Sequence, residues 1–168
     1  MRAQGMTLMD LMIALSVITI LSSLGLPAIG ALLSNSRLHG AKNEVATHLS
    51  LARSAAITHN QAAVLCPSND GEICSRGAWA QGWIVFVDAN NNRQRNKGEA
   101  LIQVKQSNDR ISINTGRRNT FRFRFDGSAI GSNGTFRICD ERGPEYGWAV
   151  VVSQLGRVRS RGPGLKYC

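Results

Sequence analysis

The stretch GMTLMDLMIALSVITILSSLGLPAIG, residues 5–30, decides the architecture that we expect for this 168-residue chain. No charged side chain occurs from Leu11 to Ser36, and the apolar part up to Ile29 would span about 28 Å as a helix, roughly one bilayer core. A short basic leader, residues 1–5, precedes this segment, whereas a secretory signal peptide places its cleavage site after the apolar region. The segment therefore predicts a membrane-spanning helix that stays attached when the leader is removed.

One carboxylate, Asp10, lies near the start of this apolar helix. A charged side chain within a membrane helix costs about 2.5 to 3.5 kcal/mol on insertion scales, so it is retained where it finds a partner. Arg2 in the leader favours a cytoplasmic N-terminus. The rest of the chain is then expected outside the inner membrane, on the periplasmic side of a single-pass protein.

Beyond Pro27 the helical pattern becomes amphipathic, because apolar residues recur at three- and four-residue spacing. We expect one helix from about Thr7 to His59, bent near Gly25 and Pro27, whose second half docks a sheet. The apolar positions of that half are Leu38, Ala41, Val45, Leu49, Ala52 and Ala56.

After Asn60 the pattern changes to short strands separated by turn residues. The expected fold class is α+β: a long N-terminal helix, with a transmembrane half (6–30) and an amphipathic half (31–60), packed on a mostly antiparallel β-sheet domain (61–168). The expected strands are Ala62 to Cys66, Gly82 to Val87, Ala100 to Val104, Ile111 to Asn114, Thr120 to Phe125, Thr135 to Ile138, Trp148 to Ser153 and Arg157 to Arg161.

Four cysteines follow the helix, in a compartment where disulfides form and persist. Sequence alone allows three pairings. We favour Cys66 with Cys74 and Cys139 with Cys168, because the first pair is local and both close loops of modest length. By loop entropy these bridges contribute roughly 2.5 and 3.5 kcal/mol. A zinc site is the alternative for the first pair, but its spacing does not fit the common zinc patterns.

Positive charge is concentrated at the C-terminal end of the chain. The net charge is +9, and residues 117–168 hold 10 of the 20 basic side chains and only 4 of the 11 acidic ones. The segment GRVRSRG, residues 156–162, alternates arginine with other residues, so an extended strand would present Arg157, Arg159 and Arg161 on one face about 6.6 Å apart. Such a row suits phosphates, whereas the alternative is an edge strand protected from aggregation by its charge. Lys166, Arg117 and Arg118 could extend the basic surface.

Enzymatic chemistry is not indicated. The three histidines lie on the expected helix, too far apart or on different faces to bind one ion, and none accompanies a candidate nucleophile. Asp88, Asn90, Asn92 and Glu99 match part of a calcium loop, but Arg93 stands where the turn glycine belongs. We interpret this segment as an asparagine-rich hairpin loop, with calcium as the alternative, and expect no cofactor, metal or catalytic residue.

The N-terminal stretch resembles the processing signal of type IV prepilins and pseudopilins. The resemblance implies cleavage after Gly5 by a prepilin peptidase and N-methylation of Met6. Asp10 stands where these families usually have Glu, which in filaments pairs with the free amine of a neighbouring subunit. Pro27 stands where the family commonly has a helix-kinking proline.

Further motifs extend the resemblance over nearly the whole chain. Trp83 to Asn90 (WIVFVDAN), FRICD at 136–140 and a final GRVR before a terminal Cys together resemble the FimT/GspH family of minor pilins. In the FimT branch the G-R-x-R segment, here Gly156, Arg157 and Arg159, is associated with DNA binding during uptake for natural transformation. Arg161 is our extension from the alternation. The GspH branch belongs to type II secretion pseudopili.

The resemblance implies a minor pilin that binds extracellular double-stranded DNA through phosphates. Its other partners would be major and minor pilins through the N-terminal helix, the inner membrane before assembly, and the peptidase. After assembly it would lie in the pilus at the cell surface. The alternative function is structural, as a pilus-priming minor pilin or a secretion pseudopilin without DNA binding.

Overall fold

The structure is a computed structural model that describes residues 8–76, 79–106 and 110–168, without the side chains of 23–28. The chain divides into two compact units, Met1–Ser36 and Arg37–Cys168. Helix α1, Leu8–His59, contributes to both units, as the apolar and amphipathic patterns predict. The predicted bend at Gly25 and Pro27 stays a prediction, although the secondary structure is helical through these positions.

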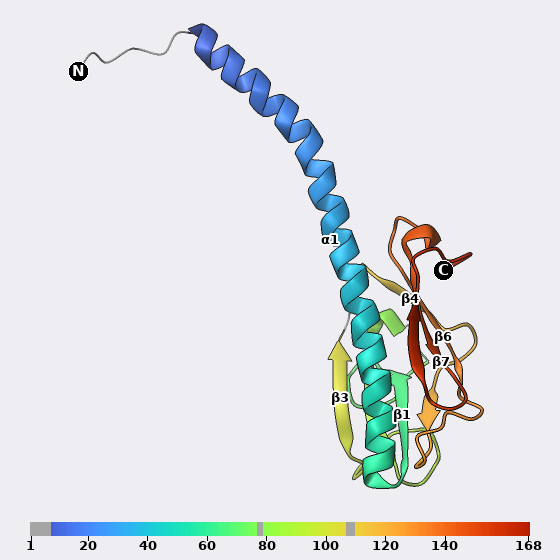
Figure 1. Cartoon of the computed structure of the whole chain (residues 1–168). Helices are drawn as coiled ribbons and strands as arrows, with labels where there is room; N and C mark the ends of the chain where they lie inside the picture. The colour runs from blue at the N-terminus through green and yellow to red at the C-terminus, as the bar shows by residue number, and fades with distance from the viewer. Residues whose placement is uncertain (1–7, 77–78, 107–109) are drawn as a thin grey trace. The chain divides into compact units, whose positions relative to one another are not determined.

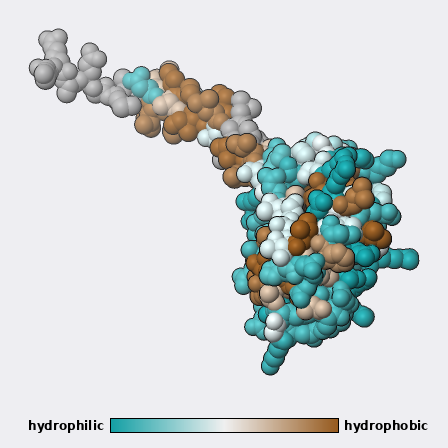
Figure 2. Space-filling model, turned by 60° about the horizontal axis from the view of Figure 1, so that its bottom comes forward, coloured by the Kyte–Doolittle hydropathy of each residue, from teal (hydrophilic) through white to brown (hydrophobic). Residues whose placement is uncertain are grey.

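The first unit exposes apolar side chains from Leu8 to Leu21, and its described surface is largely hydrophobic in Figure 2. Within the described residues, no helix is sufficiently long and apolar to cross a membrane. The membrane-spanning helix predicted for residues 6–30 is therefore not confirmed in that part of the chain. Met6 and the side chains of 23–28, which belong to the predicted span, lie outside the description.

The second unit contains two four-stranded antiparallel sheets (Figure 1). The first, sheet A, has the order β3-β2-β1-β5 and the second, sheet B, the order β4-β6-β7-β8. Sheet A consists of β1 (Ala62–Pro67), β2 (Gly82–Asp88), β3 (Leu101–Gln106) and β5 (Phe121–Phe123). Sheet B consists of β4 (Ser112–Asn114), β6 (Gly134–Cys139), β7 (Trp148–Val152) and β8 (Val158–Arg161).

All eight predicted strands are confirmed, with ends that differ by one or two residues. The sequence analysis did not separate them into two sheets, and it missed the short 3-10 helices η1 (Trp79–Gln81) and η2 (Pro144–Tyr146). The division follows from long-range pairing: β1 pairs with β2 on one side and with β5 on the other.

One hydrophobic core joins the second part of α1 to both sheets. Leu38, Val45 and Leu49 on the helix are almost completely buried, as their three- and four-residue spacing requires. They meet aromatic and β-branched side chains from alternate strand positions: Leu65, Val85, Phe121 and Phe123 from sheet A, and Phe136, Ile138, Val150 and Val152 from sheet B. The core and both sheets therefore belong to the unit Arg37–Cys168.

Polar contacts fix the helix on the sheets at the edge of this core. Trp83 Nε1 donates a hydrogen bond to Nδ1 of His48 at 2.9 Å, and Lys105 Nζ pairs with Glu44 at 2.7 Å. Burial lowers the pKa of His48, and this is the largest effect on it. Nearby Glu44 raises this pKa, whereas nearby Lys105 lowers it. The neutral imidazole is thus the form that accepts the indole hydrogen bond.

Two disulfides close loops around the sheets, and both predicted pairings are confirmed: Cys66–Cys74 and Cys139–Cys168. Cys66 lies on β1 beside Val64, Ile84 and Phe86, which form a second, smaller cluster. Cys139 ends β6 and holds the C-terminal residue of the chain.

Candidate functional site

The hairpin between β7 and β8 presents the arginine row. Gly156 N–H donates to the Ser153 carbonyl at 2.9 Å, and Ser153 N–H donates to the Arg157 carbonyl at 3.0 Å. Arg157 N–H in turn donates to Oγ of Ser153 at 3.1 Å. These bonds close the turn before β8 begins at Val158. Arg157 therefore lies at the base of the turn, whereas the predicted strand included it.

Gly156 fixes the hairpin against a neighbouring turn. The residue is buried, its φ is +72°, and a Cβ atom there would lie 1.9 Å from the carbonyl oxygen of Gly127. Nε of Arg53 on α1 donates to that same oxygen at 3.0 Å. Gly156 is buried and has no side chain, so the structure gives it the role of positioning the arginines that follow, and a ligand contact of its own stays a prediction.

The register of β8 on β7 decides which way each side chain points. Val158 is opposite Val152 and Ser160 is opposite Val150, and both valines of β7 belong to the core. Arg159, opposite Val151, and Arg161, opposite Ala149, must therefore project from the other face of sheet B, which we call the outer face.

All three arginines are exposed. Among the residues that the structure describes, the ion pairs are Lys105 with Glu44 and Arg142 with Asp140, and neither includes Arg157, Arg159 or Arg161. A guanidinium without an internal carboxylate keeps its full charge and its donors for an external anion. The row therefore fits an anionic ligand.

Two hollows flank the row, and both lie within the second unit. One, of about 610 Å³, lies between α1 and the hairpin and is lined by Ser50, Arg53, Ser54, Ile57, Gly156, Arg157, Val158 and Arg159. The other, of about 490 Å³, lies on the hairpin and is lined by Val151, Ser153, Leu155, Ser160 and the three arginines. Arg157 and Arg159 contribute to both, so an anion can approach them from either side.

The remaining predicted basic residues are distributed differently. Lys166 is exposed on the C-terminal tail. Arg117 and Arg118 follow β4, and Nε of Arg118 lies 3.6 Å from the Cβ position of Gly134 at the start of β6, so β7 lies between this side chain and β8. Arg118 is half-buried and donates to the carbonyl of Gly131 at 2.8 Å. Arg117 and Arg118 line a different hollow from the three arginines, and their extension of the β8 row stays a prediction.

Sequence reasoning missed Arg137 and Tyr167. Arg137 on β6 is opposite Ala149, which is opposite Arg161, so the three residues lie in line across the outer face. The guanidinium of Arg137 lies 4.4 Å from the ring centroid of Tyr167 and donates to its hydroxyl at 3.0 Å. The alternation of Phe136, Arg137 and Ile138 could have indicated that Arg137 points outward, but its alignment with Arg161 depends on strand pairing.

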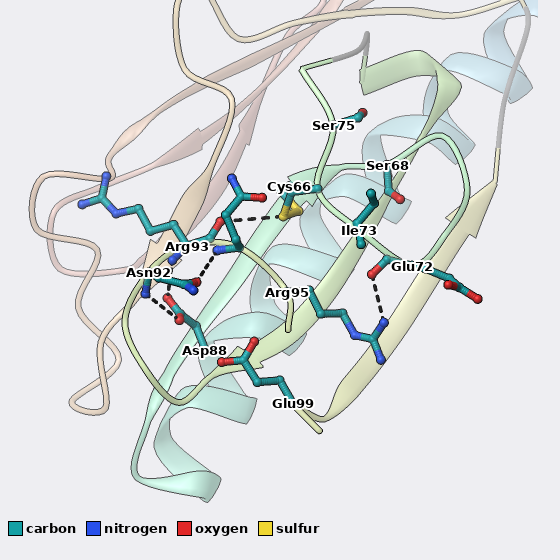
Figure 3. Close-up of a disulfide and its surroundings, with 12 residues drawn as sticks. Cys66, Ser68, Glu72, Ile73, Ser75, Asp88, Asn92, Arg93, Arg95 and Glu99 are labelled. Carbon is teal, nitrogen blue, oxygen red and sulfur yellow. Dashed lines mark hydrogen bonds between the residues drawn. A yellow bond between two sulfur atoms is a disulfide. The ribbon is translucent and has the colours of Figure 1, made fainter. Parts of the chain in front are cut away.

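The asparagine-rich loop between β2 and β3 uses its polar groups internally (Figure 3). Asp88, which is fully buried, accepts the backbone N–H of Asn92 and Arg93 at 3.0 and 3.1 Å. Glu99 accepts the N–H of Ala89 and Asn96 at 3.0 and 2.8 Å. The hairpin-loop interpretation accounts for these carboxylates without calcium, and no acidic, His or Cys cluster suited to a metal occurs among the described residues.

The adjoining Cys66–Cys74 loop is held in the same way. Backbone N–H groups of Glu72 and Ile73, together with the Ser68 hydroxyl, hydrogen-bond to Asp70 and lower the pKa of its carboxyl. Arg95 connects the two loops, because its Nη1 donates to the Glu72 carbonyl at 2.9 Å, as Figure 3 shows. The carboxyl group of Asp70 and the guanidinium of Arg95 are thus occupied in holding backbone.

The predicted processing residues are only partly covered by the structure. Gly5 and Met6 lie outside the described residues. Asp10 is exposed in the first turn of α1, where a carboxylate is favoured by the positive end of the helix dipole. Cleavage, methylation and pairing of Asp10 stay predictions.

Comparisons with known proteins agree with this architecture. A family model described as Type II transport protein GspH matches residues 41–156. Two crystal structures of the type IV minor pilin FimU from Pseudomonas aeruginosa (strain PAO1) are similar, with TM-scores of 0.63 and 0.62, both at 20% sequence identity. They match 79% and 78% of this chain and 96% and 99% of the FimU chains. At this identity the likeness shows the fold alone. No curated protein gives a significant match.

Proposed function

Since the chain belongs to the GspH family of pilins and pseudopilins, we propose that it is a minor type IV pilin of the FimT branch that binds extracellular double-stranded DNA for uptake in natural transformation. Membership in this family of structural, non-enzymatic proteins implies other pilins and prepilin peptidase as partners, and a location in the membrane or the pilus. The DNA ligand is our addition, and it depends on the β7–β8 hairpin.

The observation that supports the proposal is the outward arginine row without an internal counter-charge. Arg159 and Arg161 alternate on the outer face about 6.6 Å apart along β8, and exposed Arg157 precedes them at the base of the turn. Each guanidinium can bind a phosphate through two parallel hydrogen bonds and stays charged at any physiological pH. Contacts to phosphates carry no sequence information, so binding through them is expected without sequence preference.

The position of β8 also suits a long ligand. Strand β8 is at the edge of sheet B, and within the described residues no further strand pairs with its free edge. The turn is held by Gly156 against Gly127 and by Arg53 on α1, which gives the row a rigid base. A fixed row of donors loses less conformational entropy on binding than a flexible arginine-rich tail would lose.

We extend the proposal to processing and location. Cleavage after Gly5 and methylation of Met6 would give the mature subunit, and Asp10 would pair with the new amine of a neighbour during assembly. Before assembly the protein would be anchored in the inner membrane with its β domain in the periplasm, and afterwards it would lie in the pilus. In that position the arginine row can meet DNA outside the cell.

A structural role is the second candidate, and the comparisons favour it. The matching family model describes type II transport proteins, and the FimU structures belong to a minor pilin. In that role the chain would prime a pilus or join a secretion pseudopilus without binding DNA, and the arginines would meet an acidic partner protein.

DNA-binding isotherms distinguish the two roles. The full chain in a non-ionic detergent is titrated into a labelled duplex of arbitrary sequence, alongside Arg157→Ala/Arg159→Ala. Exposed Arg76 and Lys97 lie outside the hairpin, so Arg76→Ala/Lys97→Ala removes the same charge elsewhere. We expect most affinity to be lost only in the hairpin variant. Equal losses in the two variants, or no binding by the unchanged chain, would reject the DNA proposal and leave the structural role.

A further inference from the structure

The C-terminal tail places an exposed aromatic ring beside the arginine row. Tyr167 is 59% exposed although its ring centroid lies only 4.4 Å from the guanidinium of Arg137. Most buried or interfacial tyrosines gain their stability from apolar packing, whereas this ring contacts a cation and leaves most of its surface to solvent.

Three contacts hold the tail around this ring. Cys168 is bonded to Cys139 on β6, and its carbonyl accepts a hydrogen bond from Nδ2 of Asn114 at 2.9 Å. Leu165 N–H donates to the carbonyl of Pro144, also at 2.9 Å. The backbone on both sides of Tyr167 is therefore fixed, and the Arg137 hydrogen bond to its hydroxyl fixes the ring. An exposed ring so restrained is preorganised to receive a flat ligand.

The ring is aligned with the proposed phosphate contacts. Arg137, Ala149 and Arg161 are opposite one another on neighbouring strands, which puts the α-carbons of the two arginines about 10 Å apart. Ala149, which lies between them, is small and buried, so no large exposed side chain of β7 separates the two arginines. A strand whose phosphates lie on Arg159 and Arg161 can therefore reach Tyr167 with a neighbouring base.

We infer that Tyr167, supported by Arg137, is a stacking platform for an unpaired base, so that this face binds single-stranded DNA in addition to duplex. The inference rests on the proposed function, because the same arginines hold the backbone of either ligand. A paired base in a duplex is covered above and below by its neighbours, whereas an unpaired base offers its face to an aromatic ring. Frayed ends and single strands are the form of DNA that gains from this contact.

A second tyrosine provides a matched control. Tyr146 is 46% exposed and lies 4.5 Å from the guanidinium of Arg142, so the two tyrosine–arginine pairs are alike in geometry. Arg142, however, is ion-paired with Asp140 at 2.8 Å, and that carboxylate repels a phosphate chain. Tyr146 is therefore not expected to contribute to DNA binding.

The test uses fluorescence anisotropy of the full chain in non-ionic detergent, with a short labelled oligothymidylate and a blunt duplex of the same length. Tyr167→Ala should weaken binding to the single strand about tenfold, since stacking on one aromatic side chain is worth that much, and should change duplex binding by less than about twofold. Tyr167→Phe, which keeps the ring, should bind like the unchanged chain. Tyr146→Ala should alter neither affinity.

Each other outcome has a definite meaning. An unchanged single-strand affinity in Tyr167→Ala, or equal losses for the two DNA forms, would overturn the stacking platform while leaving the arginine row intact. A chain that binds duplex but no single strand would overturn it as well. Failure to bind either DNA rejects the proposed function itself. If Tyr167→Ala melts at a lower temperature, Tyr167→Leu, which retains bulk without an aromatic face, takes its place and must show the same selective loss.

Discussion

Two hairpins of the second unit carry clusters of polar side chains, and they use them in opposite ways. In the loop between β2 and β3, Asp88 and Glu99 turn inward and accept the loop's own backbone N–H groups. In the β7–β8 hairpin, Arg157, Arg159 and Arg161 point outward and have no ion pair within the described residues. A charged cluster thus indicates a ligand only where the fold has not already used its hydrogen-bonding groups.

The difference predicts a division between stability and binding. Substitutions at the inward carboxylates should lower the free energy of unfolding and leave DNA affinity unchanged, because their partners are backbone groups. Substitutions at the outward arginines should instead lower DNA affinity and leave the free energy of unfolding nearly unchanged. The glycines of the two hairpins should differ as well, because one is packed against backbone and the other faces open space.

The largest effect is expected for Gly156→Ala. Its φ of +72° and the 1.9 Å approach to the Gly127 carbonyl both oppose a Cβ atom. We expect the free energy of unfolding in urea to fall by at least about 3 kcal/mol, with loss of the arginine geometry. Gly98→Ala in the other hairpin, where φ is +97° but nothing lies within 4 Å, should cost only about 1 kcal/mol. Equal costs would mean that Gly156 does not anchor the hairpin.

Asp88→Ala should give the next largest change. It removes the buried carboxylate that accepts the N–H groups of Asn92 and Arg93, of which Asn92 N–H retains a second acceptor, Oδ1 of Asn90, at 3.1 Å. A loss of about 2 kcal/mol in the free energy of unfolding is expected from charge-assisted hydrogen bonds of this kind. DNA affinity, measured on the same protein sample, should not change. A large loss of affinity would show that the two hairpins are coupled.

An acid titration tests how helix α1 is held on the sheets that carry both hairpins. Burial holds the pKa of His48 below its ordinary value of 6.5, so as pH falls past that value the unfolded chain takes up the proton first. The melting temperature should therefore decline progressively below pH about 6.5 and be independent of this group above it. His48→Gln should flatten that part of the profile. A stability that rises on acidification would contradict the neutral imidazole beside Trp83.

The smallest effect on stability is expected for Arg159→Ala. The side chain is exposed and has no ion pair within the described ranges, so the free energy of unfolding should change by less than about 0.5 kcal/mol. Chemical denaturation followed by tryptophan fluorescence checks this. A loss comparable to that of Asp88→Ala would assign the arginine a structural role.

Local patterns predicted most of the fold. Alternation and turn residues located all eight strands, and the spacing of Leu38, Val45 and Leu49 identified the buried face of the helix. The grouping into two sheets could not be predicted in this way. It depends on β1 pairing with β5, more than fifty residues away along the chain, and nothing local in either strand specifies that partner.

The candidate site shows the same limit. The outward direction of Arg159 and Arg161 follows from the period of two, which is a local property. Charge composition does not tell where Arg117 and Arg118 lie relative to the β8 row, because that depends on the order of the strands. Tyr167 was missed because its position depends on a disulfide and on the register of β6, β7 and β8.

The central claim, that outward arginines of the β7–β8 hairpin neutralise phosphates, is tested most directly by the salt dependence of duplex affinity. A plot of log affinity against log salt concentration should have a slope near −3 for the unchanged chain, since about three phosphates are neutralised. In Arg157→Ala/Arg159→Ala the slope should be smaller by about two, whereas Arg76→Ala/Lys97→Ala should keep the original slope. A hairpin variant whose slope equals that of the unchanged chain would contradict the account.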